Sequence, residues 1–249
     1  YKSAKTERML LGPAAYLTKD YSDAFEPEDM CNEYWQDVDL PHDYVIEGIP
    51  STEYPQARGY LKYENAWYRK HFNLSEEDKD KRITLYFEGV GTNATVYLNG
   101  CLVKHNFCGY TPFEIDVTST VYFDKENVLA VYTDISENEG WWYEGGGIYR
   151  HVWLIKTDKI AVDLWGVYVN PQKNDNGWTV NTETTLINSS ENDEQVTVKS
   201  VISDSDGKET GSAENVLDTY TWEKSTLNQQ IEVKEPLLWD IDIPNMYTM

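Results

Sequence analysis

The chain has 249 residues, a net charge of −22 and an isoelectric point near 4.4. Such an acidic balance excludes nucleic acid as a partner, because phosphate binding needs a basic surface, and it argues against an anionic membrane. No apolar run approaches the roughly 18 residues of a membrane helix. With 40% hydrophobic residues, the chain can bury a core in one large domain or two smaller ones.

Cysteines and histidines predict neither a disulfide framework nor a metal site. The three cysteines, Cys31, Cys101 and Cys108, are sparse and odd in number, so we expect them to be reduced. Reduced cysteines favour a bacterial cytoplasm, with a secreted or periplasmic location as the alternative. The four histidines lack metal-ligand spacing, and we expect no metal and no cofactor.

The first 40 residues are irregular, with two expected elements. Residues 9–11 are a short apolar run that predicts an edge strand, and the acidic segment 25–35 predicts a short helical turn. Pro41 ends a strand, and we expect His42 and Asp43 to bond to the backbone of the turn that follows.

Short strands then follow at regular spacing. The alternation of side chains predicts strands at residues 67–74, 83–88, 94–98, 101–105, 113–117 and 128–133. The dipeptide Asn99-Gly100 predicts a tight hairpin turn, and the charge run 75–82 predicts a solvated turn. This pattern is typical of an all-β sandwich.

The segment 133–155 is the most informative part of the chain. Three aromatic residues, Trp141 to Tyr143, precede Glu144 and the glycines at 145–147, and residues 148–155 predict a strand. Consecutive glycines suit a bend with positive φ or a close backbone approach, so we expect the aromatics on a loop at the rim of the sandwich. Indole faces and carboxylates together suit carbohydrate binding; packing of the two tryptophans beside a sharp turn is the alternative.

A second set of strands is expected at residues 161–170, 178–187, 195–203 and 229–233, with polar turns at 171–177, 188–194 and 204–211. Their size predicts a small immunoglobulin-like sandwich, with domains at residues 1–159 and 160–249. About five strands are present where such folds have about seven, so we expect this domain to be C-terminally incomplete. An unpaired sheet edge is a template for another chain, so a homo-oligomer is one expectation.

The sequence resembles family 2 glycoside hydrolases. The segments that carry the resemblance, all in the family's order, are residues 40–44 (LPHDY), 67–72 (WYRKHF), 87–90 (FEGV), 96–100 (VYLNG), 109–113 (GYTPF), 142–150 (WYEGGGIYR), 236–239 (PLLW) and 244–247 (PNMY). The resemblance implies a jelly-roll sugar-binding domain followed by an immunoglobulin-like domain. It also implies that both catalytic glutamates lie on a (β/α)₈ barrel of the same polypeptide, beyond this chain. We therefore expect no catalytic residue here, and a parent enzyme that is most simply a β-galactosidase.

The resemblance also implies a binding loop. By analogy, the loop before the glycines reaches the active-site mouth and contributes the candidate sugar-binding residues Asn138, Glu139, Trp141, Trp142, Tyr143 and Glu144. His42, Asp43 and Arg150 belong to the structural motifs. Many relatives carry Arg where this chain has Trp141, and the best-known β-galactosidase has an acidic sodium ligand there; we carry over no metal site.

Other functions stay open at this point. The parent enzyme could be a β-glucuronidase or a β-mannosidase, and the chain could be a free-standing carbohydrate-binding module, since jelly rolls with aromatic rims do this. A third reading gives the sandwich a purely structural role, in which the aromatic loop is packing.

Overall fold

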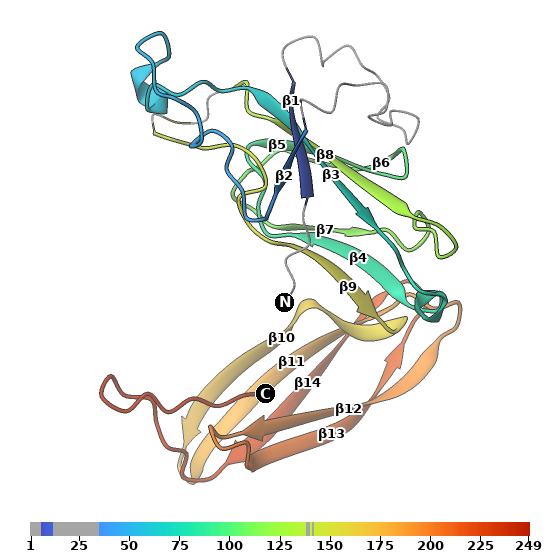
Figure 1. Ribbon diagram of the computed structural model, residues 1–249. Helices are drawn as coiled ribbons and strands as arrows, with labels where there is room; N and C mark the ends of the chain where they lie inside the picture. Colours follow the sequence, from blue (N-terminus) through green and yellow to red (C-terminus); the bar gives the residue numbers. More distant parts are fainter. Residues whose placement is uncertain (1–5, 12–34, 138–139, 141) are drawn as a thin grey trace. The chain divides into compact units, whose positions relative to one another are not determined.

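A computed structural model describes residues 6–11, 35–137, 140 and 142–249 (Figure 1). The chain divides into two compact units, residues 1–156 and residues 157–249. The regular secondary structure of the described residues is almost entirely β-strand, which confirms the expected all-β fold class. The domain boundary after residue 159 and the incompleteness of the second domain stay predictions.

Within its described residues, the first unit holds a sheet in the order β2-β1-β3-β8-β5-β6 and a second sheet in the order β7-β4-β9. The strands are β1 (Thr6–Leu11), β2 (Trp35–Val38), β3 (Asn65–Phe72), β4 (Arg82–Phe87), β5 (Asn93–Leu98), β6 (Cys101–Asn106), β7 (Phe113–Asp116), β8 (Asn127–Asp134) and β9 (Val152–Thr157). Two short 3₁₀ helices, η3 (Gln56–Arg58) and η4 (Glu76–Asp78), lie in the connections.

Alternation along the strands builds one core from both sheets. In β5, Ala94, Val96 and Leu98 are fully buried, while the residues between them are partly exposed. They belong to the same apolar cluster as Phe87 of β4 and Phe113 of β7. The two phenylalanine rings, on paired strands, stack with centroids 4.8 Å apart. The two sheets therefore form a sandwich around a shared core.

The hairpin between β5 and β6 turns where the sequence predicts it. Asn99 and Gly100 have φ values of 52° and 80°, as a two-residue turn with positive φ requires. The side chain of Asn99 also accepts a bond from the Val128 amide at 2.9 Å and donates to the Asn127 side chain at 2.9 Å. These bonds tie the turn to the start of β8.

The charge run at 75–82 is more than a solvated turn, so that expectation is wrong in part. Asp78 is 9% exposed and accepts a bond from Lys156 at 2.5 Å. This bond, followed by the Ser75 amide, lowers the pKa of Asp78. At the end of the run, Arg82 donates to Asp116 at 2.8 Å. The run therefore anchors β4 to its neighbouring strands through two ion pairs.

The second unit holds a sheet in the order β10-β11-β14 and a β12-β13 pair among its described residues. The strands are β10 (Ile160–Asn174), β11 (Gly177–Asn188), β12 (Glu194–Ser203), β13 (Glu209–Thr219) and β14 (Lys224–Val233). Its buried apolar cluster is small and comprises Val180, Ile202, Ile231 and Val233. At the C-terminal end, Thr248 exchanges two backbone hydrogen bonds with Ser203, at 2.8 and 2.9 Å.

Two strand predictions for the first unit need correction, and one helical prediction is not tested. β1 is not an edge strand, because it pairs with both β2 and β3. The expected strand at 148–155 begins only at Val152, since residues 145–147 take up the bend before it. The expected helical turn at 25–35 lies outside the described residues, apart from Trp35, which opens β2.

Two predictions for the second unit also need correction. The turn expected at 171–177 is mostly strand, because β10 continues through Pro171 to Asn174. β10 is the outer strand of its sheet, where proline's missing N–H costs no ladder bond. The sequence pattern predicts a turn for the first residues of β13 and no element for the rest. The polar sequence of β13 lacks an apolar alternation, and backbone pairing with β12 defines the strand.

The stacked core predicts a large effect of truncation. We expect Phe87→Ala to lower the free energy of unfolding by about 3–5 kcal/mol, because it removes a fully buried ring and leaves a cavity. Phe107→Ala is the matched control, since Phe107 is 70% exposed, and we expect a change below about 1 kcal/mol. Urea denaturation measures both; equal effects would contradict the placement of the core.

Candidate functional site

The glycine segment 145–147 lies between two other stretches of backbone. On one side, the amides of His42 and Tyr44 donate to the carbonyls of Ile148 and Gly146, at 2.8 and 3.1 Å. On the other side, Gly147 and Gly91 form an antiparallel bridge. The segment is therefore held by backbone bonds from residues 42–44 and from residue 91.

Side chains cannot replace these glycines. Gly145 and Gly147 have φ values of 72° and 112°, which L-residues with a Cβ rarely adopt. A Cβ on Gly145 would lie 2.5 Å from Oδ2 of Asp43, and a Cβ on Gly146 would lie 2.8 Å from Ile135. At Gly147 a Cβ would collide with the hydroxyl of Tyr68, a residue that is 1% exposed. The expectation of a positive-φ bend with close backbone approach is confirmed.

Asp43 joins the motif at 40–44 to this loop. Its Oδ1 accepts bonds from the amides of Val45 at 2.9 Å and Gly146 at 3.0 Å. Its Oδ2 accepts the hydroxyl of Tyr143 at 2.6 Å. The bond to Val45 confirms the turn role expected of Asp43; the bonds to residues 143 and 146 connect segments about 100 positions apart. His42 bonds the Tyr68 hydroxyl through Nδ1 at 2.8 Å and Glu47 through Nε2 at 3.0 Å.

Tyr63, in the segment before β3, supports the loop through its hydroxyl and its ring. The Tyr63 hydroxyl accepts the amides of Glu144 at 3.2 Å and Gly145 at 3.4 Å. Its ring meets the ring of Tyr143 edge-on, with centroids 6.3 Å apart, and the Arg58 guanidinium lies 4.4 Å from its centroid. Burial, followed by the hydrogen bond to Asp43 and that group's charge, raises the pKa of Tyr143. Tyr143 therefore stays protonated well above neutral pH.

Trp142 is held in place yet accessible. Its Nε1 donates to the hydroxyl of Tyr110 at 3.2 Å, and its ring lies directly over Gly140. The Tyr110 loop is itself fixed, because the Tyr149 hydroxyl donates to the Gly109 carbonyl at 2.5 Å. Trp142 remains 58% exposed and Tyr110 56% exposed. An indole fixed at its edge and open on its surface can stack on the C–H face of a sugar ring.

The sequence-predicted site residues divide into three groups. Asn138, Glu139 and Trp141 lie outside the described residues. Trp142, Tyr143 and Glu144 lie together on the loop, and Arg150 lies further on, with its guanidinium 5.6 Å from the Tyr149 centroid. The sequence did not single out Tyr63 and Tyr110, because nothing in their local pattern shows that they contact residues 142–145, nor Arg58, which lies over the Tyr63 ring.

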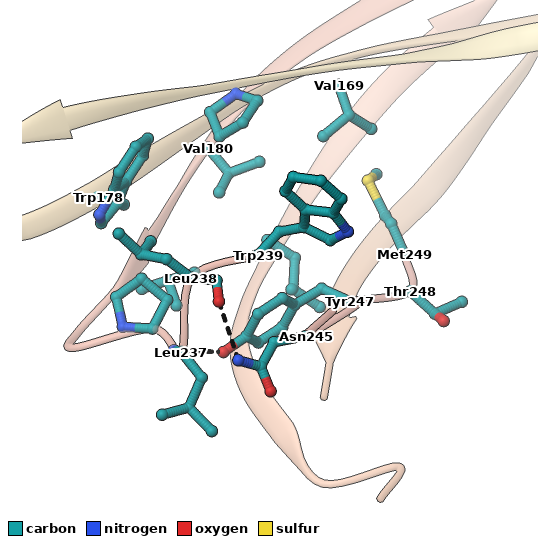
Figure 2. A pocket seen from close by; sticks show the side chains of 14 residues that line it. Val169, Trp178, Val180, Leu237, Leu238, Trp239, Asn245, Tyr247, Thr248 and Met249 are labelled. Carbon is teal, nitrogen blue, oxygen red and sulfur yellow. Dashed lines mark hydrogen bonds between the residues drawn. The ribbon is translucent and has the colours of Figure 1, made fainter. Parts of the chain in front are cut away.

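The second unit contains an apolar cavity of about 470 Å³, which differs in character from the aromatic loop of the first unit (Figure 2). Its walls include the core residues Val180, Ile202 and Val233, so it opens into the interior of the sandwich. Asn245 donates to the Leu238 carbonyl at 2.8 Å, and the Tyr247 hydroxyl accepts the Leu237 amide at 2.9 Å (Figure 2). Because its lining is mostly apolar, this cavity does not suit a polyhydroxylated ligand.

No group of three or more His, Cys, Asp or Glu residues that could hold a metal occurs in the described parts of the chain. Neither Cys101 nor Cys108 forms a disulfide with another described residue. Across the same described residues, no helix has the length and apolar character needed to cross a membrane.

Comparison with known protein families assigns each unit. Residues 39–144 match the galactose-binding domain-like family of glycosyl hydrolase 2, and residues 161–249 match glycosyl hydrolases family 2. The first match covers the sandwich that carries the aromatic loop, and the second covers the immunoglobulin-like sandwich. The chain therefore belongs to glycoside hydrolase family 2.

Comparison with individual proteins supports the same family assignment. The chain is 40% identical over 219 residues to the β-galactosidase BoGH2A of Bacteroides ovatus, which covers 86% of this chain and 26% of that protein. It is 28% identical over 250 residues to a β-glucuronidase of Formosa agariphila, covering 92% and 25% respectively. A family 2 member from Bacteroides cellulosilyticus superposes with a TM-score of 0.85 and 28% identity, over 99% of this chain and 33% of that structure. The chain thus spans about a quarter to a third of these relatives.

The close approach of neighbouring atoms at Gly147 predicts that no residue with a side chain can replace this glycine without a large loss of stability. We expect Gly147→Ala to lower the free energy of unfolding by more than about 4 kcal/mol, because its methyl group meets the buried Tyr68 hydroxyl. Gly207→Ala is the matched control: Gly207 also has positive φ, at 79°, but a methyl group there would meet no neighbouring atom within 4 Å. We expect it to cost only about 1–2 kcal/mol. Urea denaturation distinguishes the two, and similar losses would show that φ alone determines the cost.

Proposed function

We propose that this chain is the N-terminal, non-catalytic region of a β-galactosidase that hydrolyses terminal β-D-galactosides in carbohydrate metabolism. In this proposal the loop at 138–144 forms one wall of the substrate site. The observation that carries it is Trp142, an indole that is 58% exposed and bonded through Nε1 to Tyr110, close in sequence to the carboxylate of Glu144. The catalytic carboxylates of the reaction belong to a barrel domain of the same polypeptide, outside this sequence.

The chemistry of the loop supports a sugar ligand. A β-galactoside presents a C–H face for an indole and hydroxyls that donate to a carboxylate. Asn138 and Glu139, a few positions earlier in the sequence, add an amide and a second carboxylate to the proposed set.

The choice of a galactoside over a uronide rests on two further observations. The most similar relative named above, at 40% identity, is called a β-galactosidase. The net charge of −22 disfavours an anionic sugar such as a glucuronide and accommodates a neutral one.

The isolated chain is expected to be inactive. Retaining glycoside hydrolysis needs two carboxyl groups about 5–5.5 Å apart, one of them a nucleophile. The proposal places both on the barrel, so purified chain releases no nitrophenol from 4-nitrophenyl β-D-galactoside under conditions where the full-length polypeptide does. Turnover that co-purifies with the isolated chain, and is unchanged by a second chromatographic step, would refute the placement of the catalytic groups.

Trp142 is expected to contribute to substrate binding in the full-length polypeptide. Trp142→Ala should lower kcat/KM for an aryl β-galactoside about tenfold, equivalent to about 1.4 kcal/mol, with an unchanged melting temperature. Trp222→Ala is the control, because Trp222 is 70% exposed in the other unit. A lowered melting temperature with unchanged kinetics would instead show that Trp142 is a packing residue. A parallel assay with an aryl β-glucuronide tests the sugar, and preference for the glucuronide would overturn the galactoside assignment.

A further inference from the structure

We propose that Asp43 is a positioning residue for the substrate loop, and that Tyr143 belongs to the same support instead of the surface that touches sugar. This inference rests on the proposed function, since it takes residues 142–144 to be part of a wall of the sugar site. It changes the candidate binding set, because the resemblance placed Tyr143 among the residues that contact the substrate.

The hydroxyl of Tyr143 already donates its hydrogen bond to a residue of this chain. A tyrosine hydroxyl has one hydrogen to donate, and Tyr143 donates it to Oδ2 of Asp43 at 2.6 Å. Because a carboxylate only accepts, the direction of this bond is fixed. Donation to a sugar hydroxyl would require breaking a charge-assisted bond, which is stronger than a bond between neutral groups.

The ring of Tyr143 is also packed against another residue of this chain. It packs edge-on against Tyr63, and Tyr63 lies under the guanidinium of Arg58. Tyr143 is 37% exposed, against 58% for its neighbour Trp142. The side chain with the greater free surface is therefore Trp142.

Three consecutive amides fix the backbone around Glu144. Tyr63 accepts the amides of Glu144 and Gly145, and Asp43 accepts the amide of Gly146. Both acceptors come from segments outside the loop, and Asp43 is itself fixed by the amide of Val45. This arrangement holds Trp142 and Glu144 in one geometry before a ligand arrives, which is how a preorganised site reduces the cost of binding.

The experiment compares Asp43→Asn, Tyr143→Phe and the double variant in the full-length polypeptide. Each single change removes the same hydrogen bond between a carboxylate and a hydroxyl. We expect each to raise KM for an aryl β-galactoside about fivefold, with kcat within about twofold. The double variant is expected to be no worse than either single variant, because groups that act through one bond are not additive. Asp204→Asn is the matched control, since Asp204 likewise accepts two backbone amides, each at 3.0 Å, in the other unit.

Two readouts without sugar separate the support from the proposed function. In the chain with ¹³Cζ-labelled tyrosine, Asp43→Asn is expected to bring the pKa of Tyr143 down toward its ordinary value of about 10. Asp43→Ala removes the acceptor of the Gly146 amide, so this amide is expected to exchange with solvent at least tenfold faster in Asp43→Ala, and at its normal rate in Asp204→Ala. Unchanged exchange and an unchanged Tyr143 titration would overturn the positioning role.

The kinetic outcomes also differ. If the increase in KM of the double variant equals the product of the two single-variant increases, the proposal is overturned, because the Tyr143 hydroxyl would then contact sugar independently of Asp43. If Trp142→Ala changes the kinetics while Asp43→Asn does not, the proposed function stands and the positioning role fails. If neither variant changes them, the loop is no wall of the site and both fail.

Discussion

The first unit depends on one constraint, which is that three stretches of backbone meet at residues 145–147 with no room for a side chain. Residues 42–44 bond to one edge of this segment, and Gly91 bonds to the other. Glycine is required there both by positive φ and by the neighbours that a Cβ would meet. Because the segment is so closely held, the residues just before it, Trp142 to Glu144, project from a rigid base. Rigidity at the base is what allows a loop residue to serve recognition.

Much of the fold could be predicted because its signals are local. The turn at Asn99 and Gly100 depends on two adjacent residues, and the alternation in β5 depends only on which face is buried. The strand β13 was missed because its side chains are polar and its structure comes from pairing with β12. Pro171 suggested a turn, and only its position on an outer strand explains why it lies within β10.

The candidate site could be predicted only in part, for the same reason. The aromatics and glycines at 142–147 are adjacent in sequence and visible as a motif. The bond between Asp43 and Tyr143 joins positions 100 residues apart, and it depends on how residues 42–44 register against residues 146–148. Tyr63 and Tyr110 come from connections with no periodic pattern, so their contacts with the loop follow only from the assembled sandwich. Family membership likewise leaves the sugar undefined, because a relative named β-galactosidase and one named β-glucuronidase each match most of this chain, 86% and 92% respectively.

The central proposal is that residues 142–144 belong to a wall of a β-galactoside site, with Trp142 and Glu144 facing the ligand. The most direct measurement is a crystal structure of the longest natural polypeptide that carries this sequence, in complex with a non-hydrolysable β-galactoside analogue. The account predicts the indole of Trp142 against a sugar face, a Glu144 oxygen within hydrogen-bond distance of a sugar hydroxyl, and Tyr143 still bonded to Asp43. A ligand bound in the catalytic pocket with the loop remote from it, and Trp142 covered by protein, would contradict the account.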